Sequence, residues 1–164
     1  MHTVHHDDLR TLLDACRPAS VLLLDAGPGG LPGDWSAAHP DCRVTHLDAG
    51  NLPARLESLE RFDLGVVANT LEHLDRRAAG RVLARLRDLQ TRRFVALLPI
   101  GPAWQGQRSH WEIADLLAYG MTLLRRYRTD AGPLILFHYA IETYKSTPEW
   151  FNARHWAHPQ NWRP

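Results

Sequence analysis

The chain has few of the residues that mark several common classes of protein. Only two of its 164 residues are cysteines, Cys16 and Cys42, which are too few for a disulfide framework and lack the spacing of metal ligands. Lysine occurs once, at Lys145, and the net charge is only +1. This balance gives no global electrostatic reason to expect nucleic acid or an anionic membrane as a partner.

The sequence also lacks any apolar run that approaches the length of a membrane-spanning helix. Met1 to Asp8 is polar and rich in histidine, unlike a charged-then-apolar leader. The histidines of the second half show no metal-ligand spacing, so no metal site is expected. Together with the low cysteine count, these features predict a cytoplasmic protein.

Short apolar runs do occur, and they alternate with segments of helical periodicity. The predicted strands are Ser20–Leu24, Arg43–Leu47, Phe62–Ala68, Arg93–Leu98, Met121–Tyr127 and Leu134–Ile141. The predicted helices are Asp7–Cys16, Asp34–His39, Asn51–Arg61, Arg76–Leu89 and His110–Tyr119, the last capped by Ser109. A short polar turn containing glycine joins the last two strands as a hairpin.

This alternation predicts an α/β protein with a Rossmann-like three-layer sandwich. The sheet should be mostly parallel, with the C-terminal hairpin adding antiparallel strands. Residues 1–164 are expected to form one domain, in which residues 144–164 are an aromatic-rich tail with a helix start at Thr147. In such sheets ligands bind beyond the carboxyl ends of the strands, at the point where the strand order reverses.

Three stretches carry a resemblance to the class I S-adenosylmethionine-dependent methyltransferase fold. They are VLLLDAGPGG, HLDAG and FDLGVVANTLEHL, which resemble the first, second and fourth motifs of that family. The resemblance covers residues 20 to 141. It implies S-adenosylmethionine as cofactor, with the glycine loop around its methionine part and an acid after the second strand on the ribose hydroxyls. The tail is similar to a small group of uncharacterised bacterial proteins.

The sequence departs from the family pattern on one side of the expected cofactor site. Leu23 stands where the first motif usually has its acid, and Asp25 stands at the usual first glycine. The helix after the glycine loop is cut to little more than a turn. Between Asp48 and Phe62 there is room for one helix and no strand, so one complete βα unit is expected to be missing.

The candidate cofactor-binding residues follow from the matched positions. They are Asp25, Gly27, Gly29, Asp48, Asn69 and Thr70. All but Asp25 have a simpler alternative: the glycines can form a tight turn, Asp48 can cap a turn, and Asn69 and Thr70 can satisfy backbone groups at a strand end. Glu72 and His73 are the only adjacent acid and base candidates, and the choice between catalysis and a structural role stays open.

Two functions remain open from the sequence. The first is an S-adenosylmethionine-binding methyltransferase-like protein that methylates a small molecule. The second is a degenerate, non-catalytic member that acts as an interaction or assembly module with a protein partner. The tail tryptophans, which include Trp150, Trp156 and Trp162, are expected to cover core left exposed by the missing unit, or else to form a stacking platform or partner surface.

Overall fold

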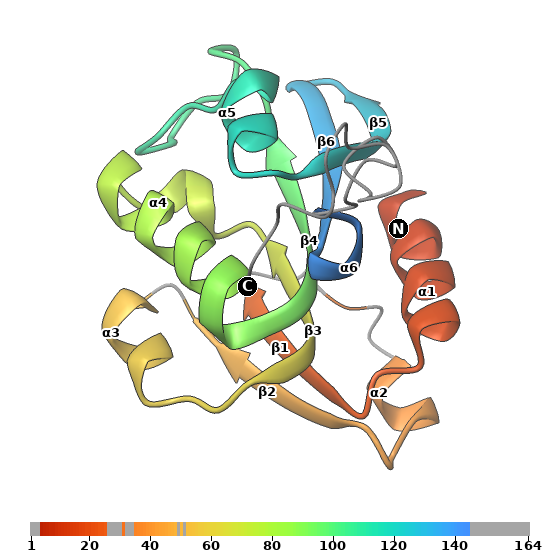
Figure 1. The fold of residues 1–164 in the computed structure, drawn as a ribbon. Coiled ribbons are helices and arrows are strands. Elements are labelled where there is room, and N and C mark those ends of the chain that lie inside the picture. Colours follow the sequence, from red (N-terminus) through yellow and green to blue (C-terminus); the bar gives the residue numbers. More distant parts are fainter. Residues whose placement is uncertain (1–3, 26–30, 32–34, 49, 51, 145–164) are drawn as a thin grey trace, which may run out of the picture.

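A single six-stranded sheet forms the centre of the computed structural model, which describes residues 4–25, 31, 35–48, 50 and 52–144 (Figure 1). The strand order is β2-β1-β3-β4-β6-β5. Strands β1 to β4 pair in parallel, and β6 pairs antiparallel with both β4 and β5. The strands are β1 (Ser20–Asp25), β2 (Arg43–Leu47), β3 (Phe62–Ala68), β4 (Thr91–Pro99), β5 (Thr122–Thr129) and β6 (Gly132–Ala140).

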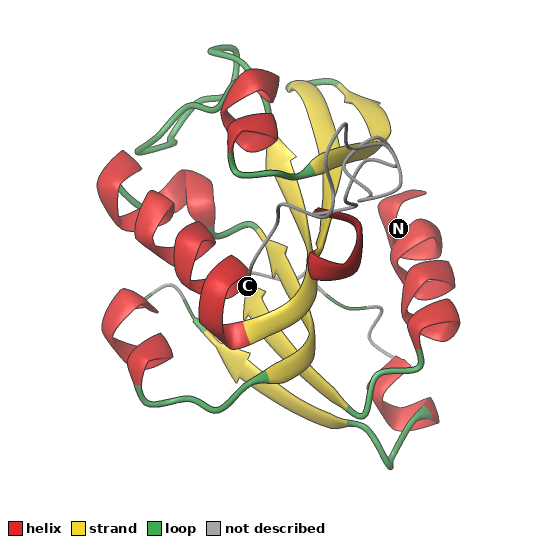
Figure 2. Ribbon diagram, in the orientation of Figure 1, coloured by secondary structure: helices red, strands yellow, loops and turns green. Residues whose placement is uncertain are grey.

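Helices cover the two faces of this sheet and complete three layers (Figure 2). In Figure 1, α3, α4 and α5 lie on one face and α1 and α2 lie on the other. The helices are α1 (Val4–Cys16), α2 (Trp35–Ala38), α3 (Leu52–Glu57), α4 (Arg76–Arg85), α5 (Ile113–Ala118) and α6 (Ile141–Tyr144). The fold predicted from the sequence is confirmed. Between β2 and β3 the described residues form α3 and no strand, as expected for a missing βα unit.

Strand β4 shows why the central apolar runs become strands with both faces buried. Phe94, Ala96 and Leu98 pack into the core on the side of α3, α4 and α5. The alternate residues Val95 and Leu97 pack into the core on the side of α1 and α2. Because successive side chains of a strand point to opposite faces, an uninterrupted apolar run fits a strand that is covered on both sides.

The end of α4 differs from the sequence prediction. Asp75 caps the helix as its carboxylate accepts a hydrogen bond of 2.9 Å from the Ala78 N–H, but the regular helix ends at Arg85. A wide π-type turn follows over Leu86–Gln90. This turn shifts the helical register, so Leu89, which the sequence periodicity places with Val82 and Leu86 on the buried side, is 56 % exposed while Gln90 is buried.

Helix α5 also begins later than predicted, and Ser109 does not cap it. The Ser109 hydroxyl instead donates to the Leu71 carbonyl at 3.0 Å and accepts from the Trp111 indole at 3.0 Å. The carboxylate of Asp115 accepts from the Glu112 N–H at the start of the helix, at 2.8 Å. As a result Leu116 is buried, and Leu117, which the sequence periodicity places with Trp111 and Ala118 on one core-facing side, is 50 % exposed.

No helix of the described part of the chain has the length and apolar character that crossing a membrane requires. The predicted helix start at Thr147 lies outside the described residues.

We predict that Gly65→Ala destabilises the protein, because Gly65 of β3 pairs with Phe94 of β4 and leaves no room for a Cβ atom. A Cβ atom there would be 2.9 Å from the Phe94 Cβ and 3.0 Å from the Thr91 Cγ2. Overpacking of this kind costs about 1–3 kcal/mol, measurable as a lower free energy of unfolding in urea. Adding Thr91→Ser removes one of the two clashes and should recover part of the loss; equal stability of Gly65→Ala and the wild type would contradict the packing.

Candidate functional site

The strand order reverses between β1 and β3, so the carboxyl ends of these strands mark the expected binding edge. Asp25 ends β1, lies beside Ala68 of β3 in the sheet, and is only 6 % exposed. The His46 Nε2 of β2 lies 3.2 Å from the Asp25 carbonyl oxygen. A carboxylate is therefore held at the point where β1 leaves the sheet.

Asp48 follows β2 at the same edge and is exposed. Its Oδ1 atom accepts hydrogen bonds from the Gly50 N–H at 2.9 Å and from the Arg55 guanidinium at 3.1 Å. These two donors lower the pKa of Asp48 below its usual value, so the side chain is ionised at neutral pH. The second oxygen, Oδ2, takes part in neither bond, which leaves acceptor capacity towards solvent or a ligand.

The turn after β3 places Asn69 in an uncommon conformation. Its φ is +46°, in the left-handed region that residues other than glycine seldom adopt, although asparagine tolerates it better than most. The His73 Nε2 lies 3.0 Å from the Asn69 Oδ1 and links the two ends of the turn. A strained backbone conformation persists only where the surrounding structure holds it, and such residues are often found at functional sites.

Thr70 and Glu72 are buried beneath this turn. The Thr70 hydroxyl donates to the Ala68 carbonyl at 2.7 Å, and the Thr70 N–H donates to the Glu72 carboxylate at 3.0 Å. Thr70 thus satisfies backbone groups at the strand end. The Glu72 carbonyl accepts the N–H groups of Arg108 at 2.8 Å and Ser109 at 3.1 Å, so this residue joins the β3 turn to the loop after β4.

Burial is the main cause that raises the pKa of Glu72 above its usual value, and the negative charge of nearby Asp25 acts in the same direction. The hydrogen bond from Thr70 and the neighbouring His73 oppose this shift. Glu72 and His73 are therefore a buried carboxyl and a half-buried imidazole at the binding edge. Carboxyl and imidazole groups are among the side chains that transfer protons in catalysis, and here the two are adjacent.

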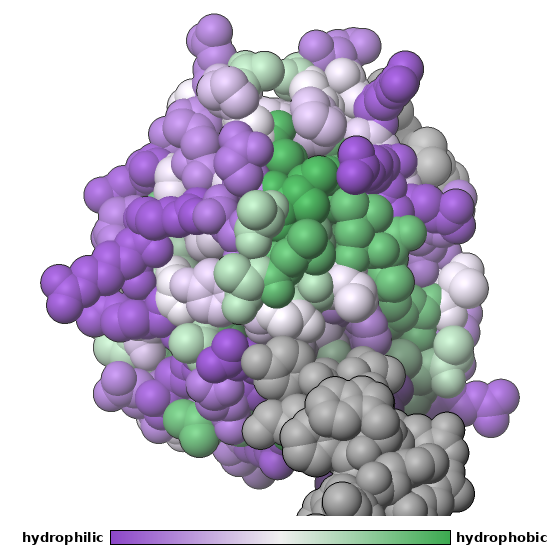
Figure 3. Space-filling model, turned by 45° about the horizontal axis from the view of Figure 1, so that its top comes forward, coloured by the Kyte–Doolittle hydropathy of each residue, from purple (hydrophilic) through white to green (hydrophobic). Residues whose placement is uncertain are grey.

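A cavity of about 400 Å³ opens at the ends of β3 and β4. Asn69, Glu72 and His73 line it on the β3 side. The other lining residues are His5 of α1, Ala68 of β3, and Leu97, Pro99, Trp104, Gln105, Gln107 and Leu134. Figure 3 turns this end of the molecule towards the viewer and shows hydrophobic side chains gathered in the middle of a hydrophilic surface.

The structure distributes the predicted site residues over two parts of this edge. Asn69 lines the cavity, whereas Asp25 and Asp48 stand at the ends of β1 and β2 and are not among its lining residues. Gly27 and Gly29 lie outside the described residues. Sequence reasoning missed Trp104, Gln105 and Gln107, although a loop rich in glycine, proline and glutamine directly after a strand is the signal that could have found them.

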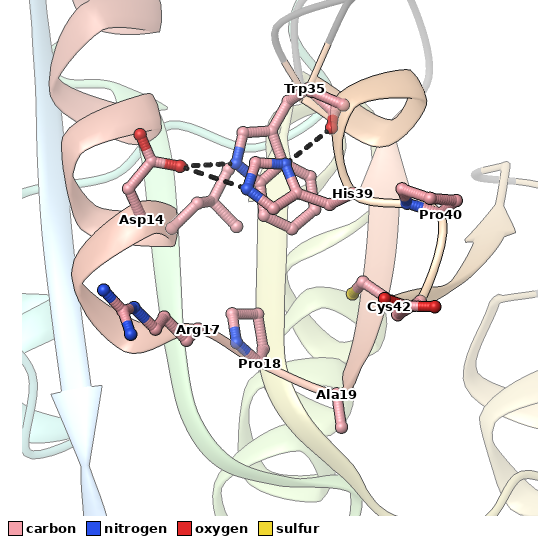
Figure 4. Close-up of a pocket in the computed structure, with 11 residues that line it drawn as sticks. Asp14, Arg17, Pro18, Ala19, Trp35, His39, Pro40 and Cys42 are labelled. Atoms are coloured by element: carbon pink, nitrogen blue, oxygen red, sulfur yellow. Dashed lines mark hydrogen bonds and ion pairs between the residues drawn. The ribbon is translucent and has the colours of Figure 1, made fainter.

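A larger cavity of about 600 Å³ lies at the opposite end of the sheet, between α1 and α2 (Figure 4). There the Trp35 indole donates to the Asp14 carboxylate at 2.9 Å, and the His39 ring stacks on Trp35 with the centroids 4.3 Å apart. This cavity adjoins the amino ends of β1 and β2. Ligands of open α/β sheets bind at the carboxyl ends, so size alone does not make it the candidate site.

Among the described residues, no three His, Cys, Asp or Glu side chains form a group that could hold a metal ion.

Comparison with known protein families gives one match over nearly the whole chain. The model of DUF6231, described as a family of unknown function, matches residues 3–163. No curated protein matches the sequence.

Solved structures with a similar fold include methyltransferases with bound S-adenosylhomocysteine. Magnesium protoporphyrin IX methyltransferase from Synechocystis PCC 6803, with bound S-adenosylhomocysteine, is 14 % identical, and the match covers 82 % of this chain and 80 % of that one with a TM-score of 0.57. The Burkholderia thailandensis 1,6-didemethyltoxoflavin-N1-methyltransferase is 20 % identical, with 84 % and 78 % covered and a TM-score of 0.54. TehB from Haemophilus influenzae is 13 % identical, with 80 % and 61 % covered and a TM-score of 0.57. At these identities the likeness establishes a methyltransferase-like fold.

The raised pKa of Glu72 predicts a pH-dependent stability. The folded protein binds a proton at the Glu72 carboxyl group more tightly than the unfolded chain does. The stability that this proton adds to the folded state is therefore fully present below the ordinary glutamate pKa and is lost as the pH rises through the pKa of the folded state. Glu72→Gln removes that loss, since an amide oxygen can still accept from Thr70. In thermal unfolding between about pH 4 and pH 8, the variant should gain stability relative to the wild type as the pH rises. Glu57→Gln, at an exposed position of α3, is the control; a constant difference between Glu72→Gln and the wild type would refute the assignment.

Proposed function

The chain belongs to DUF6231, a family of unknown function, and has a methyltransferase-like fold; from this premise we propose that it binds S-adenosylmethionine or its demethylated product and methylates a small molecule. The cofactor would lie across the carboxyl ends of β1 and β2. The methyl acceptor would occupy the 400 Å³ cavity at the ends of β3 and β4. One domain formed by residues 1–164 would supply both parts.

Asp48 is the single observation that carries this proposal. An ionised carboxylate stands at the carboxyl end of β2, and its Oδ2 is bonded by neither Gly50 nor Arg55. Ribose hydroxyls are donors that such an oxygen can accept. The same side chain also closes the turn to Gly50, so it would serve the turn and the ligand at once. Asp25, nearly buried at the end of β1, supports a second contact beside the glycine loop.

The residues at this edge fit methyl transfer because the reaction depends mainly on positioning. When bound, S-adenosylmethionine would supply a methyl group on a positively charged sulfur, with the neutral thioether S-adenosylhomocysteine as the leaving group. The residues of this edge would then have to hold the acceptor in line with that methyl group and receive the proton that the acceptor gives up. The cavity would hold the acceptor in line and exclude water, while Glu72 or His73 stands within the same cavity wall to take the proton.

A second function has its own support. The sheet ends at β2 in the described part of the chain, so the side of the site next to β2 lacks the βα unit that the family has. The missing unit favours an alternative function, in which the protein is a degenerate, non-catalytic domain that binds a protein partner. The two functions differ in whether the cofactor binds.

Calorimetric titration with S-adenosylmethionine and with S-adenosylhomocysteine separates the two functions. We expect binding of both, with a Kd below about 1 mM. A protein that is folded by circular dichroism and takes up neither ligand at millimolar concentration would leave the interaction module as the function.

Asp48→Ala should weaken the binding of S-adenosylhomocysteine by more than about tenfold, because hydrogen bonds to a charged group contribute about 1.5–3 kcal/mol. Asp88→Ala is the matched control, since Asp88 is also an exposed aspartate paired with an arginine, Arg87, but lies beyond α4. The control should bind as the wild type does. Equal affinities for all three proteins would show that Asp48 does not hold the ribose.

A further inference from the structure

The cavity at the ends of β3 and β4 fits a narrower class of occupant than small molecules in general. We propose that it binds a small, planar, uncharged heteroaromatic compound whose edge carries both a hydrogen-bond donor and an acceptor, as a lactam does. The inference deepens the proposed function, on which it rests for the methyl transfer. Occupancy of the cavity can be measured without the cofactor.

A fixed aromatic ring forms one wall of the cavity. The Trp104 indole donates to the Pro133 carbonyl at 3.2 Å, at the start of β6. Gly132 allows this approach, because a Cβ atom there would be 2.9 Å from the Trp104 Nε1. Gly132 also has a φ of +144°, which other residues rarely adopt. A ring held in this way offers a flat face for stacking at little entropic cost.

The loop that carries Trp104 is anchored near both of its ends. The N–H of Ile100 donates to the Pro133 carbonyl at 3.0 Å, and the N–H of Gly101 donates to the Trp111 carbonyl at 2.9 Å. At the far end of the loop, the Glu72 carbonyl accepts hydrogen bonds from the N–H groups of Arg108 and Ser109. The cavity wall is therefore set by backbone hydrogen bonds before any ligand binds.

Carboxamide groups supply the polar contacts. Asn69, Gln105 and Gln107 all line the cavity, and each amide offers a donor and an acceptor. The Oε1 atom of Gln107 is buried and accepts no hydrogen bond from any described residue, which is a costly state for a polar atom. A ligand N–H that drew this amide towards the cavity would remove the cost. The N–H donor and carbonyl acceptor of one carboxamide side chain can pair with the carbonyl and N–H of a lactam edge.

The charges of the cavity disfavour an anion. Among the described lining residues there is no lysine or arginine, and the carboxyl group of Glu72 is buried. A phosphate or carboxylate placed here would lose its hydration without gaining a permanent cation. The histidine rings of His5 and His73 also line the cavity, and the other walls are apolar, from Leu97, Pro99 and Leu134. A volume of about 400 Å³ suits one or two fused rings.

Three probe compounds test the proposal on the full-length protein. They are 2-quinolone, which is planar and neutral with a lactam edge; quinaldate, which has the same ring size with a carboxylate; and caprolactam, which has the lactam without an aromatic ring. Each is titrated by calorimetry with and without saturating S-adenosylhomocysteine. We expect 2-quinolone to bind with a Kd below about 1 mM and the other two to bind at least about tenfold more weakly.

Substitutions at two positions of the cavity wall locate the binding. Trp104→Leu should weaken 2-quinolone about tenfold, as loss of stacking predicts, whereas Trp104→Phe keeps an aromatic face and should lose less. Asn69→Gly removes the amide, suits the left-handed backbone, and should also weaken 2-quinolone. Leu124→Ala, at an exposed position of β5 outside the cavity, is the control and should bind as the wild type does.

The outcomes separate this inference from the proposed function. Binding of 2-quinolone without any binding of S-adenosylhomocysteine would support the cavity assignment and reject the methyltransferase function. Binding of S-adenosylhomocysteine without 2-quinolone, or equal affinities for 2-quinolone and quinaldate, would overturn the inference. Unchanged 2-quinolone affinity in Trp104→Leu and Asn69→Gly would overturn it as well, because the probe would then bind elsewhere.

Discussion

Burial of both faces of the central strands is the constraint on which the rest of the structure depends. Strands β1, β3 and β4 are apolar on both sides, so neither face can be left to water. Leu9 and Leu13 of α1, with Trp35 of α2, cover one face, and α3, α4 and α5 cover the other. Because the core fills both sides, ligands are left with the ends of the strands. The candidate site lies at such an end for that reason.

Glu72 connects this core to the candidate site. Its carboxylate orders the turn after β3 through Thr70, and its carbonyl orders the loop after β4 through Arg108 and Ser109. The two segments that line the cavity are thus positioned by one buried residue. Burial of this carboxyl group, which organises the two segments, also raises its pKa above the usual value.

Much of the fold could be predicted from the sequence because the strands are short apolar runs between clear breaks. The observed bounds of β2 and β3 are those predicted, and β1 differs by one residue. The misplaced elements are those that tertiary contacts decide. The π-type turn that exposes Leu89 leaves no periodic signal, and Ser109 resembles a helix cap while its hydroxyl serves Leu71 and Trp111. The cavity residues of the loop after β4 were missed because a loop has no periodicity from which to infer its neighbours.

Strand β2 shows how the sheet tolerates the loss of its outer unit. As the last strand of the sheet in the described part of the chain, it presents unpaired main-chain groups along one side, which invite another chain to add a strand. Yet β2 has only five residues, and it carries the exposed side chains of Arg43 and His46. Arg43 pairs with Glu60 and covers the Phe62 ring. Short edge strands and charged side chains prevent other chains from pairing with the edge of a sheet. Strand β2 has both features, so the shortened sheet ends in a strand that resists such pairing.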